Sequence, residues 1–294
     1  MTERAEDDAG LARTVAAFAT GALSAPIALM RLLIATEDVD VVAAVVAGQA
    51  ELRALLAANR AGCQRICEML RSGLDSPEPA RTVEAGLAAA RTLFDYSVQA
   101  SPESSVALYS LGNPELLALA TAEVVNLLDE WRLLSVHARC LQIGCGIGRF
   151  EAAIGPRVAE ARGIDLSANM VAQARRRCAA VAHVAFDLTD GRDLSLFGDG
   201  RFELVYAVDS FPYLVHAGAA LVATHVAEAA RVLVAGGAFV ICNYSYRDDL
   251  ARDRDDLARL AAAHDFTVEV AGERPLRLWD GTVWRLRKPS RHED

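Results

Sequence analysis

Three glycines at alternating positions follow a short hydrophobic segment in the middle of the chain, and this pattern constrains the fold most strongly. Residues 140 to 151 read C-L-Q-I-G-C-G-I-G-R-F-E. Because glycine has no Cβ atom, the backbone at Gly144, Gly146 and Gly148 can turn sharply and a ligand can lie against it. A hydrophobic strand that runs into such a loop is typical of α/β sheets that bind nucleotides or related cofactors.

The segments around this loop alternate between short apolar runs and helical patterns. Strands are predicted at 139–144, 161–165, 183–186, 202–208, 238–244, 267–271 and 283–286, and helices at 149–158, 168–179, 221–233 and 255–264. This alternation predicts an α/β fold with a doubly wound, mostly parallel, seven-stranded sheet. Ligands in such sheets bind at the carboxyl ends of the strands, so we expect the functional residues there.

The first hundred residues have a different character. From about residue 11 to residue 93 the long Ala, Leu and Val runs show helical periodicity, which predicts an all-helical module. Pro and small polar residues near 100–105 mark a boundary, so we expect a helical module at 1–105 and a second domain at 106–294. The uncharged stretch 14–30 is shorter than the ~20 residues of a spanning helix and contains Gly21 and Pro26, so it is expected to be a buried helix and not a membrane segment.

Charge and cysteine content narrow the class of protein. The net charge of -9 argues against a nucleic-acid partner, because such proteins gain affinity by neutralising phosphates with Lys and Arg. Six cysteines without a preceding signal peptide favour a reducing cytoplasm. Cys63 and Cys67 are one helical turn apart, but two thiols without a second pair make a poor zinc site, so no metal is expected.

The spacing of the glycines distinguishes between two classes of ligand. A dinucleotide site would show G-x-G-x-x-G, and the third small residue is replaced here by Arg149. The spacing G-x-G-x-G instead resembles the first motif of class I S-adenosylmethionine-dependent methyltransferases. Asp165, in G-I-D-L-S, ends the next predicted strand seventeen residues after Gly148 and can accept hydrogen bonds from both ribose hydroxyls.

Further segments resemble the same family in the same order. Ser167 is a good N-cap for the helix A-N-M-V-A-Q-A-R-R-R. The third strand closes with A-F-D-L, the fourth reads R-F-E-L-V-Y-A-V-D-S-F with Glu203 in place of the family's Asp, and the fifth is entered through A-R-V-L-V-A-G-G, with Ala235 in place of Pro. Six matched segments cover roughly residues 106 to 245, while the first hundred residues are not covered.

The resemblance implies a Rossmann-like sheet that binds S-adenosylmethionine and releases S-adenosylhomocysteine. It implies that Asp165 binds the ribose, that Leu166 and Met170 pack on the adenine, and that Asp187 accepts from the adenine amino group. The cofactor-binding residues expected from it are Tyr109, Gly144, Cys145, Gly146, Gly148, Asp165, Leu166, Met170, Asp187, Leu188, Val208 and Asp209. Tyr109 has an alternative interpretation as a buried aromatic residue between domains.

Gln142 departs from the family, which usually has Asp or Glu at this position. Its amide oxygen can still accept hydrogen bonds, but the attraction of a carboxylate for the cofactor's positive charges is lost. We therefore expect weaker cofactor binding and not an inactive site.

Catalytic residues are expected after the fourth strand, in A-V-D-S-F-P-Y-L-V-H. Methyl transfer needs an aligned nucleophile and, for an alcohol or a protonated amine, removal of a proton. Asp209 could hold the cofactor ammonium or take that proton, and Tyr213 and His216 could shape the pocket or act as the base. The alternatives are that Phe211 and Tyr213 serve packing and that His216 is a solvated helix cap.

The function expected from the sequence is methyl transfer to an O or N nucleophile of a small-molecule substrate. The helical module would be a lid, a substrate-recognition element or a dimerisation element, and no nucleic acid or membrane partner is expected. A protein or peptide methyltransferase is one alternative. A protein that binds the cofactor but performs other chemistry is the second, because a fold does not determine a function.

Overall fold

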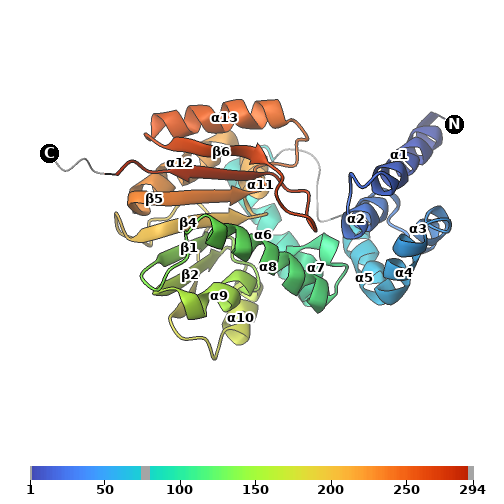
Figure 1. The fold of residues 1–294 in the computed structure, drawn as a ribbon, viewed down its shortest axis with the longest axis horizontal. Coiled ribbons are helices and arrows are strands. Elements are labelled where there is room, and N and C mark those ends of the chain that lie inside the picture. Colours follow the sequence, from blue (N-terminus) through green and yellow to red (C-terminus); the bar gives the residue numbers. More distant parts are fainter. Residues whose placement is uncertain (1, 74–79, 291–294) are drawn as a thin grey trace. The chain divides into compact units, whose positions relative to one another are not determined.

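The computed structural model describes residues 2–73 and 80–290, whose contacts divide into two compact units (Figure 1). Of these residues, the first unit comprises 2–73, Tyr96–Glu123 and Leu276–Asp280, and the second comprises 80–95, Val124–Pro275 and 281–290. The sequence predicts a domain boundary between residues 105 and 106, and a domain is a part of the chain that folds independently. Contacts alone do not test it, so it stays a prediction.

The first unit is helical, and some of its helices begin at residues with capping side chains. Ser24 accepts a hydrogen bond from Ile27 N at the start of α2, and Asp38 accepts one from Asp40 N at 2.8 Å at the start of α3. The helices of this unit are α1 (Thr2–Ala19), α2 (Ala25–Thr36), α3 (Val39–Val45), α4 (Ala50–Ala58), α5 (Arg60–Arg71), α7 (Pro102–Val106), the 3-10 turn η1 (Leu108–Ser110) and the first part of α8 (Pro114–Glu130).

The uncharged stretch 14–30 is not one buried helix. It is divided between α1 and α2 by a turn in which Gly21 has φ +76°. A left-handed glycine ends a helix at little steric cost, and Ser24 then starts the next one. Across 2–73 and 80–290 no helix combines the length and the apolar character that crossing a bilayer requires.

A separate hydrophobic core holds the first unit together. It includes Leu29, Leu32, Val42, Leu52 and Ile66, all fully buried. The α5 helix also approaches residue 111 closely, since a Cβ atom on Gly62 would lie 1.9 Å from Leu111 O. Cys63 and Cys67 are buried in this core, and all six cysteines are free thiols. The described residues contain no cluster of potential metal ligands.

The second unit contains the predicted seven-stranded sheet, with strand order β3-β2-β1-β4-β5-β7-β6. Five strands are parallel, and β7 pairs antiparallel with both β5 and β6. The strands are β1 (Arg139–Ile143), β2 (Glu160–Asp165), β3 (Val184–Leu188), β4 (Phe202–Val208), β5 (Leu233–Cys242), β6 (Thr267–Glu273) and β7 (Val283–Arg287). The fold class expected from the sequence is confirmed.

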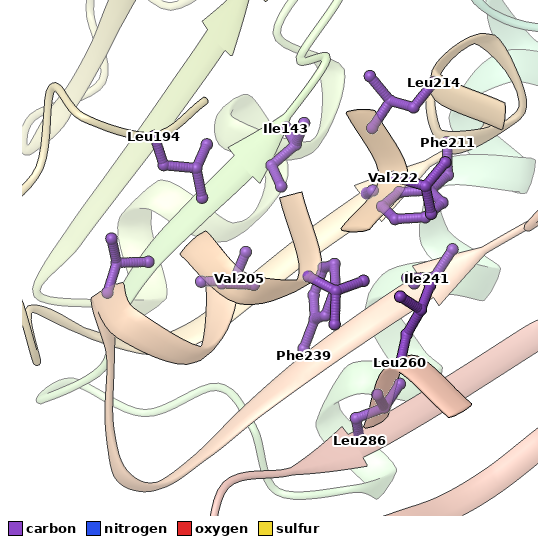
Figure 2. Packing of buried hydrophobic residues seen from close by; sticks show 14 of the residues in the cluster. Ile143, Leu194, Val205, Phe211, Leu214, Val222, Phe239, Ile241, Leu260 and Leu286 are labelled. Atoms are coloured by element: carbon purple, nitrogen blue, oxygen red, sulfur yellow. The ribbon is translucent and has the colours of Figure 1, made fainter. Parts of the chain in front are cut away.

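Helices cover both faces of this sheet. They are α6 (Val83–Ala100, of which residues up to 95 belong here), the second part of α8, α9 (Arg149–Ile154), the turn η2 (Gly155–Arg157), α10 (Ala168–Arg177), α11 (Phe211–Ala217), α12 (Ala219–Val232) and α13 (Leu250–Ala263). Alternate strand residues such as Ile143, Val205 and Ile241 pack against Val222 of α12 and Leu260 of α13 in the main core (Figure 2). A smaller cluster with Phe186 packs against α10. Because side chains alternate along a strand, Gln142 faces away from the main core.

Several elements differ from the sequence-based prediction; α13, for example, begins at Leu250 and not at residue 255, and α9 ends at Ile154 and not at residue 158. Helix α11 was not predicted, because Phe211–Ala217 is short and its apolar residues follow a strand directly. Strand β5 begins at Leu233 and not at residue 238, and its pairing with β4 shifts register between Phe202 and Leu204. The two glycines at 236 and 237 lie inside the strand, where Gly236 has φ +76°, a conformation typical of a bulge.

Candidate active site

The glycine loop connects the carboxyl end of β1 to α9. All three glycines have left-handed backbones, with φ of +69° at Gly144, +53° at Gly146 and +70° at Gly148. A Cβ atom on Gly144 would lie 2.3 Å from the Ser210 Cβ atom, so a larger residue would push apart the ends of β1 and β4. The loop is thus a surface of bare backbone, as the sequence predicts. Cys145 is buried within it, and its N–H donates to Ile164 O.

Asp165 anchors this loop to the end of β2. Its Oδ2 accepts a hydrogen bond from Gly146 N and its Oδ1 accepts one from Ser167 N, each at 2.9 Å. Burial raises the pKa of this carboxyl to about 6, although the two backbone donors oppose the shift. Each carboxylate oxygen has a second lone pair, so Asp165 can still accept from ribose hydroxyls.

The start of α10 is fixed by Ser167 and by a helix from the N-terminal part of the chain. Ser167 Oγ accepts from Met170 N at 3.1 Å and donates to Asp95 Oδ1 at 2.5 Å. Arg91 Nε, on the same helix α6, donates to Leu166 O at 3.3 Å. Leu166 is half-buried, and Met170 is buried in the core. Their expected contact with adenine stays a prediction.

Helix α6 is therefore a part of this site that the sequence analysis missed. Its residues up to 95 cross the carboxyl ends of the strands, from α11 to the start of α10. Gly86 allows the close approach to α11, because a Cβ atom there would lie 2.7 Å from Ala217 Cα. Contacts between segments so distant in sequence have no local signal, and the isolated glycine in a helical pattern is the one available indication.

The end of β3 carries the residues expected to bind adenine. Asp187 is half-buried and forms an ion pair with Arg162 of β2. Leu188 follows it with a side chain that is 53% exposed. Both residues lie at the carboxyl edge of the sheet beside Asp165, whose strand neighbour is Leu188. Their role in adenine binding stays a prediction.

A polar cluster lies where β4 and β5 end. Asp209 and Asn243 follow these strands directly and both have left-handed backbones, with φ of +57° and +69°. Asn243 Nδ2 donates to Asp209 Oδ1 at 2.9 Å, and Tyr246 Oη donates to the same oxygen at 2.9 Å. Left-handed non-glycine residues store strain and concentrate at functional sites. Val208, the residue before Asp209, is buried.

Two tyrosines form an aromatic wall on this cluster. The rings of Tyr213 and Tyr246 meet edge to face at 5.9 Å, and Phe94 of α6 contacts Tyr213 at 4.8 Å. The ring of Tyr246 is exposed, but its hydroxyl is directed at Asp209. Desolvation of that hydroxyl raises the pKa of Tyr246 well above its usual value, and the Asp209 carboxylate is the second largest cause. Tyr246 thus remains a hydrogen-bond donor to Asp209.

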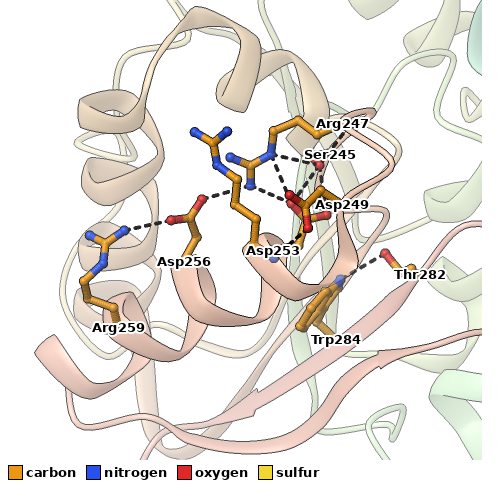
Figure 3. A network of polar contacts seen from close by, with 9 residues as sticks. Ser245, Arg247, Asp249, Asp253, Asp256, Arg259, Thr282 and Trp284 are labelled. Atoms are coloured by element: carbon orange, nitrogen blue, oxygen red, sulfur yellow. Dashed lines mark hydrogen bonds and ion pairs between the residues drawn. The ribbon is translucent and has the colours of Figure 1, made fainter.

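A buried ion-pair network holds the segment that carries Tyr246. Ser245 Oγ donates to Asp253 of α13 at 2.8 Å, and Arg247 Nη2 donates to Asp253 at 2.5 Å and to Asp256 at 2.9 Å (Figure 3). Asp253 is 4% exposed. The residues on either side of Tyr246 are thus tied to α13, which fixes the backbone from which Tyr246 reaches Asp209.

The other two predicted site residues are placed as follows. His216 lies one turn beyond Tyr213 on α11, where its carbonyl oxygen accepts from Ala80 N at 3.3 Å. Tyr109 belongs to the first unit, where it is buried and stacks on Trp279 at 5.8 Å. The catalytic role of His216 and the cofactor contact of Tyr109 stay predictions.

Known proteins with similar sequence or fold point to one class. Residues 141–241 match a family model described as a methyltransferase domain. Demethylmenaquinone methyltransferase of Tropheryma whipplei (strain Twist) is 31% identical over 117 residues, which is 39% of this chain and 46% of that protein. The chain thus spans about half the length of the curated relatives that it matches.

The fold comparison agrees. Phosphoethanolamine N-methyltransferase 1 of Haemonchus contortus, in complex with phosphoethanolamine and S-adenosylhomocysteine, superposes with a TM-score of 0.54 at 14% identity, covering 72% of this chain and 51% of that one. This superposition and the strand order show that the two proteins share a Rossmann-like fold. Through residues 141–241 the chain is similar to methyltransferase domains, and the structure on which it superposes binds S-adenosylhomocysteine, the product form of S-adenosylmethionine.

The residues present fit this cofactor. Three left-handed glycines leave bare backbone at the end of β1, and a buried carboxylate stands at the end of β2 without a positively charged side chain bonded to it. Such a site suits a ligand that carries ribose hydroxyls, and the Asp165 carboxylate attracts positive charge.

Proposed function

We propose that this chain is a methyltransferase that transfers the methyl group of S-adenosylmethionine to an O or N nucleophile of a small molecule. The observation that carries the proposal is that the polar cluster at the ends of β4 and β5 contacts the glycine loop. Ser210, which follows Asp209, packs against Gly144 and donates to Ile143 O at 2.6 Å. The cluster of Asp209, Tyr213, Asn243 and Tyr246 therefore adjoins the glycine loop.

The chain's own residues would act by binding and orientation. The glycine loop and Asp165 would hold the cofactor, with Asp187 at the adenine. When bound, the cofactor would supply an electrophilic methyl group on a sulfonium, with S-adenosylhomocysteine as the released product. Asp209, fixed by Asn243 and Tyr246, would orient the acceptor and take the proton that an alcohol or amine releases. Tyr213 would shield this site from water.

The small-molecule class is supported by charge and by relatives. The net charge of -9 disfavours a polyphosphate substrate. The relative and the similar structure, demethylmenaquinone methyltransferase and phosphoethanolamine N-methyltransferase 1, are both named for small acceptors. Helix α6 would act as a lid, since Arg91 and Asp95 bond the start of α10 and Phe94 contacts Tyr213. The remaining N-terminal helices would serve recognition or dimerisation.

A labelling experiment tests the acceptor class. The purified protein is incubated with S-adenosylmethionine labelled in its methyl group and with separate metabolite and protein extracts. We expect label in the metabolite fraction together with S-adenosylhomocysteine. Label in the protein fraction would replace the proposal with protein methylation. Cofactor binding without S-adenosylhomocysteine in either extract would contradict methyl transfer.

A further inference from the structure

A buried carboxylate lies beneath the glycine loop, and the proposed reaction makes no use of it. Glu151, on α9, is 0% exposed, and Gln142, on β1, is 1% exposed. With the amide oriented so that its nitrogen faces the carboxylate, Gln142 Nε2 donates to Glu151 Oε1 at 2.9 Å and to Oε2 at 3.2 Å. These two residues therefore form a hydrogen-bonded pair between the strand before the loop and the helix after it.

The neighbouring strand makes room for this pair. Gly163 lies in β2 directly beside Gln142. A Cβ atom on Gly163 would lie 2.7 Å from Glu151 Oε1 and 2.7 Å from the Cβ atom of Cys145 in the loop. A glycine inside a strand weakens the strand, so it marks a place where another group needs the space. The Glu151 carboxylate is one of the groups that occupy this space, together with the side chains of Cys145 and Phe186.

The surroundings of Glu151 favour its neutral form when no cation is near. The titratable groups that face it are Cys140 of β1, Cys145 of the loop, Arg149 of α9, Asp165 of β2, Cys178 of α10 and Tyr206 of β4. Burial raises the pKa of Glu151 to about 8; Asp165 raises it further, and the backbone hydrogen bond and Arg149 lower it.

An amide is a suitable partner for a group that changes charge. Its nitrogen can donate to an ionised carboxylate, and its oxygen can accept from a protonated carboxyl. A second carboxylate at position 142 would have to share a proton with Glu151, because two buried like charges in contact cannot both ionise.

We propose that Gln142 and Glu151 act as one buried pair that holds the glycine loop for cofactor binding, with Glu151 as the positioning residue. The carboxylate that the resemblance implies at position 142 of β1 is thus supplied by Glu151 of α9. The inference rests on the proposed function for the identity of the ligand. Because S-adenosylmethionine is cationic, its binding favours the ionised form of Glu151. The affinity for it therefore rises with pH more steeply than ionisation of the cofactor alone would cause.

The test is a charge-swap cycle measured by calorimetric titration with S-adenosylmethionine, which keeps the sulfonium charge, at pH 6.5, 7.5 and 8.5 and by thermal unfolding without ligand. The proteins are the wild type, E151Q, Q142E, the double variant Q142E/E151Q and the control E203Q, whose glutamate pairs with Arg139 at the other end of the sheet. We expect each single variant at positions 142 and 151 to weaken binding by about tenfold or more, and the swap to restore it to within about threefold. E151Q should also lose the extra pH dependence that E203Q keeps.

The outcomes separate the inference from the proposed function. A wild-type protein that does not bind the ligand contradicts the proposed function. If, in addition, the Tm of the double variant is no higher than that of either single variant, the pair is overturned as well. If the wild type binds, wild-type affinity and pH dependence in E151Q overturn the inference alone. If a single variant fails to fold, a folded swap that binds supports the pair, and an unfolded swap overturns it.

Discussion

At the scale of single residues, the strained backbones of Asp209 and Asn243 mark the part of the site that we propose for the methyl acceptor. Both side chains are fixed by one another and by Tyr246, at the ends of adjacent strands. A hydrogen bond to a charged group contributes about 1.5–3 kcal/mol. Tyr246 is thus the residue through which the chain controls the orientation of Asp209.

We expect Tyr246→Phe to lower kcat by about tenfold, because losing a hydrogen bond to a carboxylate frees its orientation. Affinity for the cofactor should not change. The rate of S-adenosylhomocysteine formation with the acceptor found by labelling measures the effect. Tyr96→Phe, at an exposed tyrosine of the first unit, is the matched control. A kcat equal to that of the control would contradict the role of Tyr246.

The buried acid Glu151 predicts a pH dependence of stability. Its pKa is raised from 4.5 to about 8 in the folded chain, so between these values the folded state holds a proton that the unfolded state has lost. Stability from this group is therefore present at low pH and falls as pH rises toward 8. We expect E151Q to show a smaller decline in Tm between pH 5 and about 8 than the wild type. Parallel Tm profiles would contradict the buried ionisation.

At the scale of elements, the sequence predicts the strands well and the long-range packing poorly. Strand β4 has the predicted bounds, and β1 and β2 differ by one residue, because apolar runs and glycines are local signals. The loop glycines and Asp165 were recognised for the same reason. The first part of α6 shares a contact unit with the sheet, which the sequence does not indicate. The Gln142–Glu151 pair was also missed, since no local pattern encodes contacts between side chains of separate elements.

Gly86→Ala tests the packing of α6 on α11. The added methyl group would meet Ala217 Cβ at 2.6 Å, so we expect a loss of about 1–3 kcal/mol of stability from overpacking. Binding of S-adenosylhomocysteine should also weaken, because Asp95 on the same helix caps α10. Gly10→Ala in α1, where the nearest atom is a side-chain nitrogen at 3.7 Å, is the control and should not lower Tm. Equal Tm values for the two variants would contradict the close contact.

At the scale of the whole molecule, one chain combines a helical unit with a sheet unit that carries the cofactor site. The resemblance covers the sheet unit, and the family match lies inside it at residues 141–241. The acidic net charge of -9 suits a cationic cofactor and a small acceptor better than a phosphate backbone. The helical unit has its own core, so the recognition role proposed for it can be tested separately from the proposed cofactor site.

Calorimetric titration of the wild type and of Asp165→Ala with S-adenosylhomocysteine tests the central claim most directly. Asp165 joins the glycine loop to β2 and is the carboxylate expected at the ribose. The account predicts one binding site per chain in the wild type and a loss of binding by about 100-fold or more in Asp165→Ala, while thermal unfolding shows that the variant is folded. A folded Asp165→Ala variant that binds with wild-type affinity would contradict the site.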